Sequence, residues 1–193
     1  MIIGITGGTG CGKTTLLEVI RDAGGLVLDC DAIYHRLLQT DKTLLDAIAN
    51  RFPGTVEGGV LQRKKLGAIV FADQKALSDL NRITHSAVKA EVEKQLAQQP
   101  RLAAIDAIGL FESGINKLCK LTVAVTAPEE IRVQRLMARD GISREYALAR
   151  IAAQPSEEEF SQRCDYVLTN DSTVDAFQEK CLAFLRERGI MNL

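Results

Sequence analysis

The chain has 193 residues, with 24 Lys and Arg against 25 Asp and Glu, so its formal net charge is −1. Hydrophobic residues make up 46% and charged residues 25% of the sequence, a balance that is typical of folded globular domains and excludes a disordered chain. The near-neutral charge and the 5% of aromatic residues, with no Trp, argue against a nucleic-acid binder.

Compartment signals favour the cytoplasm. No run reaches the roughly 18 consecutive apolar residues of a transmembrane helix, so no membrane association is expected. The first residues, MIIG, carry no basic segment or cleavage site, so we expect a cytoplasmic protein. The five cysteines are widely spaced without a C-x-x-C pair, which excludes a disulfide framework or zinc site and favours reduced thiols.

Strand signals in chain order predict an α/β fold with a mainly parallel sheet, because they alternate with helix signals. Five short apolar runs are expected to be strands, at residues 2–6, 26–28, 102–105, 121–125 and 166–168.

Helix signals fill the intervals between these strands. The main helices are expected at residues 13–23, 32–38, 73–99, 128–141 and 174–188. Pro128 is expected at a first helical position. Asp73 is a predicted N-cap, and Ser156 with Glu159 predicts a capping box. Residues 40–100 are mostly helical and interrupt the alternation, which indicates a helical insertion that serves as a substrate subdomain.

Residues 7–14 read GGTGCGKT, the G-x-x-x-x-G-K-T pattern of a phosphate-binding loop, between an apolar strand and a helix. Glycines let backbone N–H groups surround phosphate oxygens, and the following helix adds partial positive charge. Lys13 is expected to reach the β- and γ-phosphates of a nucleotide, and the Thr14 hydroxyl to hold Mg²⁺. We interpret Cys11 as a small spacer in this loop. The acceptor stays open between water, a protein and a small molecule.

Two carboxylates, Asp29 and Asp31, follow the second strand. If this segment stays extended, both side chains point to the same side. A kinase needs a carboxylate that takes the proton from the attacking hydroxyl, and Asp31 is a candidate for that base. The alternative is that Asp31 only caps the helix that begins at Ala32.

Five arginines lie between residues 132 and 150, with no lysine among them. Arg132, Arg135 and Arg139 share one helix face by their spacing, and arginine forks suit phosphate oxygens. Gly141 and Pro155 bracket a helical segment that resembles a hinged lid. We expect Arg139 to contact phosphate. Arg132 and Arg144 are expected on a solvated face, paired with nearby glutamates.

Three further polar residues lie outside these motifs. Asp106 follows the third apolar strand, where a carboxylate can reach Mg²⁺ directly or through water, or can be a loop residue or helix cap. Glu112 is expected to be a loop carboxylate. His85 lies alone in the long helix, and such a residue is usually a packing or surface residue.

The chain resembles the dephospho-coenzyme A kinases along nearly its whole length. The stretches that carry the resemblance are GITGGTGCGKTT (4–15), LDCDAIYH (28–35), LQRKKLGAIVF (61–71), IDAIGLFESG (105–114), APEEIRVQRLMARDGISREYALARIAAQ (127–154) and DYVLTND (165–171). The phosphate loop is shared by many kinases, whereas the Asp-x-Asp, the Arg-Asp-Gly and the Ile-Ala-Ala-Gln are more specific.

The resemblance implies ATP-dependent phosphorylation of the 3′-hydroxyl of dephospho-coenzyme A, the last step of coenzyme A biosynthesis, with Mg²⁺. It implies a P-loop kinase fold, a three-layer α/β/α arrangement with a five-stranded parallel sheet. The expected parts are a core (about 1–35, 101–135 and 163–193), a helical substrate-binding subdomain (about 36–100) and a lid (about 136–162).

The resemblance and the loop pattern together select the site residues. Lys13, Asp31 and Arg139 are expected to be catalytic, with Asp31 as the base. The acceptor is expected at Asp31, Arg63 and His85, and Mg²⁺ at Thr14 and Asp106. The nucleotide is expected to contact Gly8, Gly10, Cys11, Gly12, Lys13, Thr14 and Thr15, with Asn170 near its adenine.

The sequence departs from the family pattern at two positions. Gly109 and Ser86 stand where the family usually has Pro, and the Ser86 change weakens the role carried over to His85. One alternative function is a P-loop kinase for a nucleoside or another small metabolite. Another is a nucleotide switch that signals to a partner, although no obligate protein partner is evident from the sequence.

Overall fold

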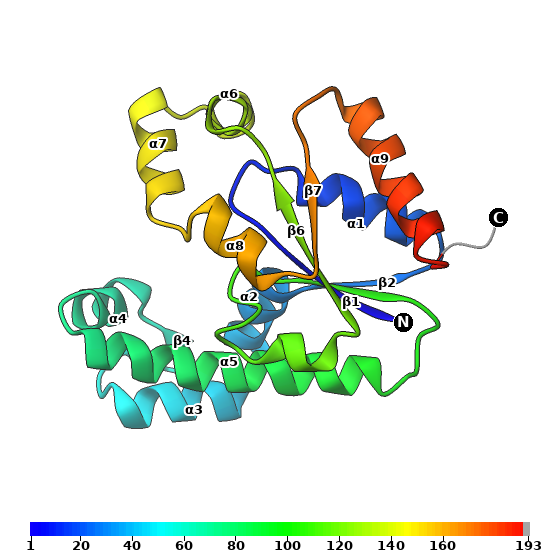
Figure 1. The fold of residues 1–193 in the computed structure, drawn as a ribbon. Helices are drawn as coiled ribbons and strands as arrows, with labels where there is room; N and C mark the ends of the chain where they lie inside the picture. The colour runs from blue at the N-terminus through cyan, green and yellow to red at the C-terminus, as the bar shows by residue number, and fades with distance from the viewer. Residues whose placement is uncertain (191–193) are drawn as a thin grey trace. The chain divides into compact units, whose positions relative to one another are not determined.

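The computed structural model describes residues 1–190, and a five-stranded sheet lies in its larger part (Figure 1). The strands are β1 (Ile2–Thr6), β2 (Leu26–Asp29), β5 (Ala103–Asp106), β6 (Leu121–Thr126) and β7 (Tyr166–Thr169), in the order β2-β5-β1-β6-β7. β1 runs parallel to both β5 and β6, and β7 runs parallel to β6. The five predicted strands and the parallel sheet are confirmed.

Helices α1 (Lys13–Asp22) and α9 (Val174–Glu187) cover one face of this sheet. Leu16 and Ile20 of α1 and Phe177 of α9 are fully buried, in one apolar cluster with β1 and β6 residues. The strands read as near-continuous apolar runs because a parallel sheet is covered on both faces. Because β1 and α1 are both packed in this core, it fixes the two ends of the loop that joins them.

Three helices separate β6 from β7: α6 (Glu129–Asp140), α7 (Arg144–Ala152) and α8 (Glu157–Arg163). Val133 and Leu136 of α6 pack with Ala147 and Ile151 of α7 in a small separate apolar cluster. The predicted capping box at the start of α8 is present. Pro128 is the N-cap of α6 and not its first helical residue, because its ψ is 138° and its carbonyl accepts the first helical hydrogen bond.

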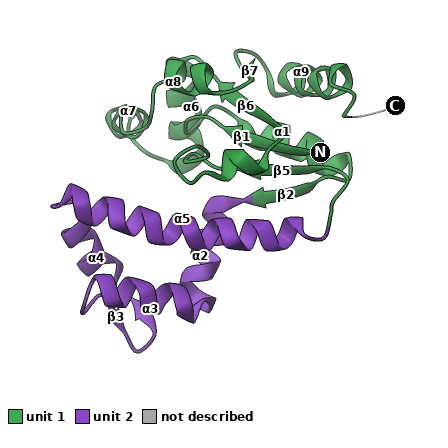
Figure 2. Cartoon of the chain, turned by 60° about the horizontal axis from the view of Figure 1, so that its bottom comes forward, with its two compact units in different colours: residues 1–28, 99–193 green, residues 29–98 purple. Residues whose placement is uncertain are grey.

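Residues 29–98 form a separate compact unit, drawn in purple in Figure 2, whereas residues 1–28 and those from 99 onward form the sheet-containing unit. The purple unit contains α2 (Cys30–Thr40), α3 (Lys42–Arg51), α4 (Arg63–Val70) and α5 (Gln74–Leu96). Asp73 caps α5 through its carboxylate, as predicted. Among residues 1–190, no helix has the length and apolar character needed to cross a membrane.

A small hairpin in the purple unit is not expected from the strand signals. Its strands, β3 (Val56–Glu57) and β4 (Val60–Leu61), are antiparallel. Gly58 and Gly59 join them with φ of 57° and 77°. Two successive positive φ values are what a two-residue hairpin turn requires, and glycine supplies them without strain.

Candidate functional site

The phosphate loop runs from the end of β1 to the start of α1. Gly7, Gly10 and Gly12 have positive φ values of 136°, 79° and 88°. A Cβ on Gly7 would lie 2.1 Å from the Val125 carbonyl oxygen, and one on Gly12 would lie 2.2 Å from Asn170 Nδ2. The glycines are therefore required both by backbone conformation and by the close approach of neighbouring groups.

The helix that follows this loop presents its first turn to a ligand. The N-cap of α1 is Gly12, so no side chain caps the helix, and the first turn contains no acidic residue. Uncapped N–H groups and the helix dipole favour an anion at this position. Lys13 Nζ reaches back along the loop and donates to the Gly7 carbonyl at 2.9 Å, while Thr14 is exposed in the first turn of α1.

Asn170 supports the loop from the end of β7. Its side chain is 4% exposed, and its Nδ2 donates to the Cys11 carbonyl at 3.0 Å. Arg135 of α6 donates to Asn170 Oδ1 at 2.9 Å and to the Gly10 carbonyl at 3.3 Å. The amide nitrogen of Asn170 thus holds the loop, and its oxygen holds Arg135 beside it. The expected place of Asn170 near adenine stays a prediction.

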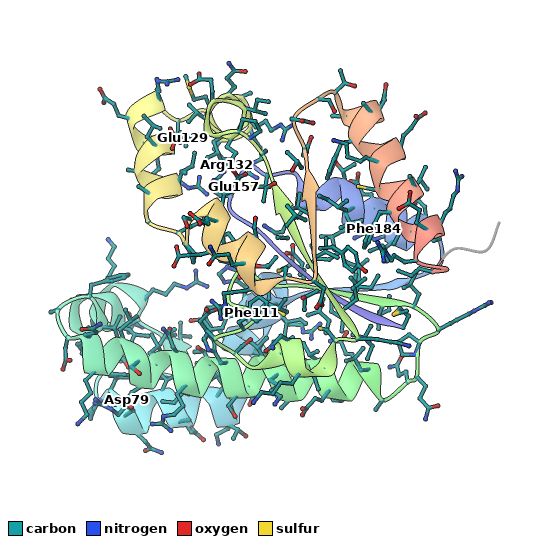
Figure 3. All side chains as sticks on the ribbon, in the orientation of Figure 1. Asp79, Phe111, Glu129, Arg132, Glu157 and Phe184 are labelled. Carbon is teal, nitrogen blue, oxygen red and sulfur yellow. The ribbon has the colours of Figure 1, made fainter. Side chains whose placement is uncertain are left out.

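Arg132 and Gln154 hold the backbone of Thr9, one at its carbonyl and the other at its N–H. Arg132 Nε donates to the Thr9 carbonyl at 2.9 Å, and the Thr9 N–H donates to Gln154 Oε1 at 2.7 Å. Arg132 is 5% exposed and lies on α6 (Figure 3). The prediction of a solvated Arg132 paired with glutamates is therefore wrong, because the α6 face that carries it packs on the loop.

Cys11 lies inside the loop and is buried. Burial raises the pKa of its thiol, and this effect exceeds the opposing influence of the Arg132 and Lys13 charges. The thiol is therefore protonated at neutral pH, as fits a small spacer residue.

Asp106 lies at the carboxyl end of β5, because the sheet register pairs it with Ile5 at the end of β1. Asp106 and Thr14 provide carboxylate and hydroxyl oxygens, the hard donors that Mg²⁺ prefers. Within residues 1–190 there is no group of three or more His, Cys, Asp or Glu that would hold a metal by itself. This donor set fits Mg²⁺ that is bound mainly through nucleotide phosphates.

Glu112 is an exposed carboxylate paired with Arg163, whose guanidinium carbon lies 4.4 Å from the centre of the Phe111 ring. Its expected role as a loop carboxylate agrees with this surface ion pair.

The remaining arginines lie around the junction of α6 and α7. Arg139 donates to both oxygens of Asp140, at 2.7 and 3.0 Å, and Arg150 donates to Asp140 at 2.6 Å. These hydrogen bonds, that of Arg139 first, lower the pKa of Asp140 to about 2. Arg144 forms a two-pronged pair with Glu130, which confirms its prediction. Contact between Arg139 and phosphate stays a prediction.

The acidic pair at the end of β2 takes neither of the two arrangements predicted from the sequence, a shared extended segment or a helix cap by Asp31. Asp29 is the N-cap of α2, and its Oδ1 accepts from the Ala32 N–H at 2.9 Å. Asp31 lies in the first helical turn and is exposed. The segment is thus not extended, and Asp31 is not the cap, because Asp29 ends the strand two residues earlier. The carboxylate of Asp31 makes no hydrogen bond or ion pair with the rest of residues 1–190.

A cavity of about 220 Å³ lies in the unit formed by residues 29–98. Its polar and aromatic lining comes from Tyr34, His35, Arg63 and Phe71, above a floor of leucine and valine side chains. Burial raises the pKa of Tyr34, and the nearby Arg63 charge partly opposes this effect. Tyr34 and His35 share a face of α2 with Asp31, at i+3 and i+4. His85 is partly buried in α5.

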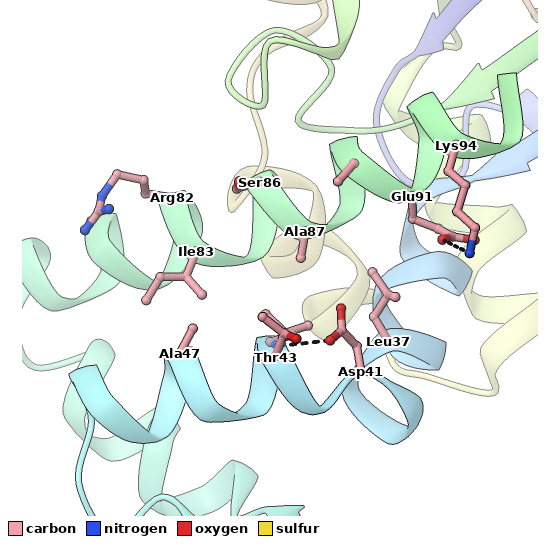
Figure 4. Close-up of a pocket in the computed structure, with 12 residues that line it drawn as sticks. Leu37, Asp41, Thr43, Ala47, Arg82, Ile83, Ser86, Ala87, Glu91 and Lys94 are labelled. Carbon is pink, nitrogen blue, oxygen red and sulfur yellow. Dashed lines mark hydrogen bonds and ion pairs between the residues drawn. The ribbon is translucent and has the colours of Figure 1, made fainter. Parts of the chain in front are cut away.

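A larger groove of about 550 Å³ runs between α3 and α5 of the same unit (Figure 4). Half of its lining residues are leucine, isoleucine or alanine, and the other half are polar or charged. The charged groups at its rim are paired: Arg82 with Asp79, and Lys94 with Glu91. Asp41, the remaining charged residue of the lining, caps α3 by accepting from the Leu44 N–H at 3.1 Å. Since its charged groups are already engaged within this unit, the groove is a weaker candidate than the cavity that contains Arg63.

Three of the residues that hold the phosphate loop are not predicted from the sequence: Arg132, Arg135 and Gln154. The i, i+3 spacing of the two arginines is a signal that they act together, but it does not say which helix face is buried. Gln154 carries no spacing signal, since its partner Thr9 is 145 residues away.

Comparison with known proteins gives a consistent family. A family model described as dephospho-CoA kinase matches residues 1–176. A protein named dephospho-CoA kinase from Lactobacillus johnsonii is 33% identical, over 97% of this chain and 98% of that protein. One of the same name from Deinococcus radiodurans is 37% identical, over 97% and 92%.

Solved structures agree with the fold. TT1252 from Thermus thermophilus has a TM-score of 0.80 and 37% identity, with 97% of both chains covered. A dephospho-CoA kinase from Campylobacter jejuni has a TM-score of 0.68 and 28% identity, with 98% of both chains covered. A shikimate kinase from Bacteroides thetaiotaomicron, at 16% identity and a TM-score of 0.52, shares the fold alone. The predicted P-loop kinase fold is confirmed.

Proposed function

Since this chain belongs to the dephospho-CoA kinase family, we propose that it transfers the γ-phosphoryl group of ATP to the 3′-hydroxyl of dephospho-CoA. The products are coenzyme A and ADP. The observation that carries the proposal is the complete phosphate loop, with an uncapped helix behind it, in a chain that matches this family over residues 1–176.

The nucleotide is bound by backbone N–H groups of the loop and of the first turn of α1, including Gly8, Gly10 and residues 11–15. Lys13 moves its ammonium from the Gly7 carbonyl to the β- and γ-phosphates. Thr14 and Asp106 would hold Mg²⁺ together with these phosphates, and the ion would neutralise charge that develops on them.

Asp31 is the proposed base. Its exposed carboxylate is engaged by no other group of the described chain and follows the end of β2 by two positions. It accepts the proton of the 3′-hydroxyl while that oxygen attacks the γ-phosphorus, and the bond from this phosphorus to the β–γ bridging oxygen breaks, releasing ADP. Arg63 and His85 are proposed acceptor contacts, within a substrate-binding subdomain of residues 36–100.

Residues 136–162 are the proposed lid. Arg139 would leave Asp140 for the transferred phosphoryl group when this segment closes. Closure excludes water, so it limits wasteful hydrolysis of ATP. We further propose that the enzyme acts in the cytoplasm on a small-molecule acceptor, without nucleic acid or an obligate protein partner.

The test is an ADP-release assay with ATP, Mg²⁺ and a panel of acceptors: dephospho-CoA, several nucleosides and shikimate. We expect dephospho-CoA alone to stimulate ADP release strongly. Stimulation by a nucleoside and not by dephospho-CoA would replace this function with that of another small-molecule kinase. ADP release that no acceptor changes would leave only a slow nucleotidase.

A further inference from the structure

Arg132 is a buried cation directly behind the phosphate loop. Its side chain is 5% exposed, and its Nε donates to the Thr9 carbonyl. Its Nη2 lies 2.3 Å from the point where a Cβ on Gly8 would be placed, so a side chain at position 8 would displace the guanidinium. The backbone of Arg132 also lies near Gly10, with its carbonyl oxygen 3.0 Å from a Cβ built there. Guanidinium and loop are therefore in direct contact.

This guanidinium has no anionic partner in the part of the chain that the structure describes. Nη2 is buried and has no hydrogen-bond acceptor. No carboxylate lies within ion-pair distance of Arg132 in residues 1–190. Glu157, the acidic residue that acts on Cys11 from the same region, accepts the Ala127 N–H through Oε1 at 2.6 Å and forms no ion pair with Arg132.

The charge of Arg132 is nevertheless felt at the loop. It is the strongest of the charges that act on the Cys11 thiol, ahead of Lys13. A buried charge without a counter-ion is costly, and groups of this kind are retained where something else compensates the charge. An anion bound at this loop would be such a group.

We propose that Arg132 is a positioning residue that holds the Thr9 peptide and supplies positive charge from behind the loop, with the phosphate chain of the bound nucleotide as its counter-ion. The inference rests on the nucleotide site of the proposed function, but not on the identity of the acceptor. The protein without nucleotide bears the cost of the uncompensated charge, and nucleotide binding removes that cost. A purely structural clamp would instead contribute the same stability to the protein with and without nucleotide.

The test compares Arg132→Gln, which keeps an N–H donor but removes the charge, with Arg132→Lys, which keeps the charge but removes the fork. Arg144→Gln is the matched control, because Arg144 is an exposed arginine paired with Glu130. The readouts are calorimetric affinities for ADP and for inorganic tripolyphosphate, and the thermal midpoint without ligand. Tripolyphosphate separates recognition of the phosphate chain from recognition of the base.

We expect Arg132→Gln to bind both ligands about ten- to a hundredfold more weakly, as for loss of an interaction with a charged group. Its thermal midpoint without ligand should not fall. Arg132→Lys should keep affinity within a few-fold of the unmodified protein, and Arg144→Gln should change neither quantity.

Unchanged affinity in Arg132→Gln would overturn the proposal. If Arg132→Gln does not fold, Arg132→Lys decides: a loss of affinity as large as tenfold there would show that the charge is not the cause. An unmodified protein that binds ADP but does not phosphorylate dephospho-CoA would contradict the proposed function and leave this inference intact.

Discussion

Asp31 occupies a position in which a carboxylate is both stabilised and available. It lies in the first turn of α2, where the helix dipole favours negative charge, while Asp29 performs the capping. The sequence predicts an acidic pair at this place but not this division of roles. Asp-x-Asp can occur both in an extended strand and at the start of a helix. Only the folded backbone decides which carboxylate accepts the hydrogen bond of the Ala32 N–H.

At the residue scale we expect Asp31→Asn to lower turnover by about 10²- to 10⁴-fold, because the acceptor hydroxyl loses its general base. ATP affinity should be unchanged, and steady-state kinetics with a binding assay will measure both. Asp29→Asn is the matched control, since asparagine caps helices as well as aspartate and activity should persist. Near-normal turnover of Asp31→Asn would remove Asp31 from the mechanism.

Gly12→Ala is a second prediction at this scale. A Cβ there would lie 2.2 Å from Asn170 Nδ2 at a φ of 88°, so the loop must distort and ADP affinity should fall by more than tenfold. Gly54→Ala controls for the strain of an alanine at positive φ, because Gly54 has a φ of 78° and, among the described residues, no atom beyond its two chain neighbours within 4 Å of its Cβ position. We expect Gly54→Ala to cost about 1–2 kcal/mol of stability and no affinity. Equal ADP affinities in the two variants would contradict this account of the loop.

At the scale of elements, the strands and most helix boundaries follow from the sequence. Apolar runs with β-branched residues predict all five strands, and side-chain caps such as Asp73 and Ser156 predict helix starts. The order of the strands does not follow, because it depends on pairing between segments far apart in the chain. The burial of Arg132 does not follow either, since helical spacing defines a face but not what packs against it.

The cavity between α2 and α4 carries the prediction for the acceptor. Phe71 lines it, at the C-cap of α4, and is 85% exposed. Stacking of a nucleobase on an aromatic ring is worth roughly 1–3 kcal/mol. If the adenine of dephospho-CoA stacks there, Phe71→Ala raises the KM for dephospho-CoA about ten- to a hundredfold, by steady-state kinetics, and leaves the KM for ATP unchanged.

Val60→Ala is the control for this variant, because Val60 is 62% exposed in the same unit and does not line the cavity. Neither variant should lower the thermal midpoint, since both side chains are exposed. An unchanged KM for dephospho-CoA in Phe71→Ala would place the base elsewhere, and an equal rise in the KM for ATP would indicate a general defect.

At the scale of the whole molecule, a net charge of −1 conceals an uneven distribution. Lys13, Arg132 and Arg135 all donate to backbone carbonyls of the phosphate loop. The sequence predicts the existence of this cationic cluster, but not the members that are buried. The chain also divides into two compact units, and we expect each proposed substrate to contact mainly one of them.

Hydrogen exchange followed by mass spectrometry tests this division. We expect ADP to slow exchange of the phosphate loop and of α6, in the sheet-containing unit, because its phosphates order the N–H groups there. Dephospho-CoA should slow exchange in α2 and α4, in the unit of residues 29–98. Protection by dephospho-CoA that is confined to the sheet-containing unit would contradict the proposed acceptor site.

Phosphorus NMR of the reaction of ATP with dephospho-CoA tests the proposed phosphoryl transfer most directly. We expect one new 3′-phosphomonoester resonance for each ADP formed, and none when a 3′-deoxy analogue replaces dephospho-CoA. Inorganic phosphate in place of that monoester, or a phosphoryl group on another atom of the acceptor, would contradict it.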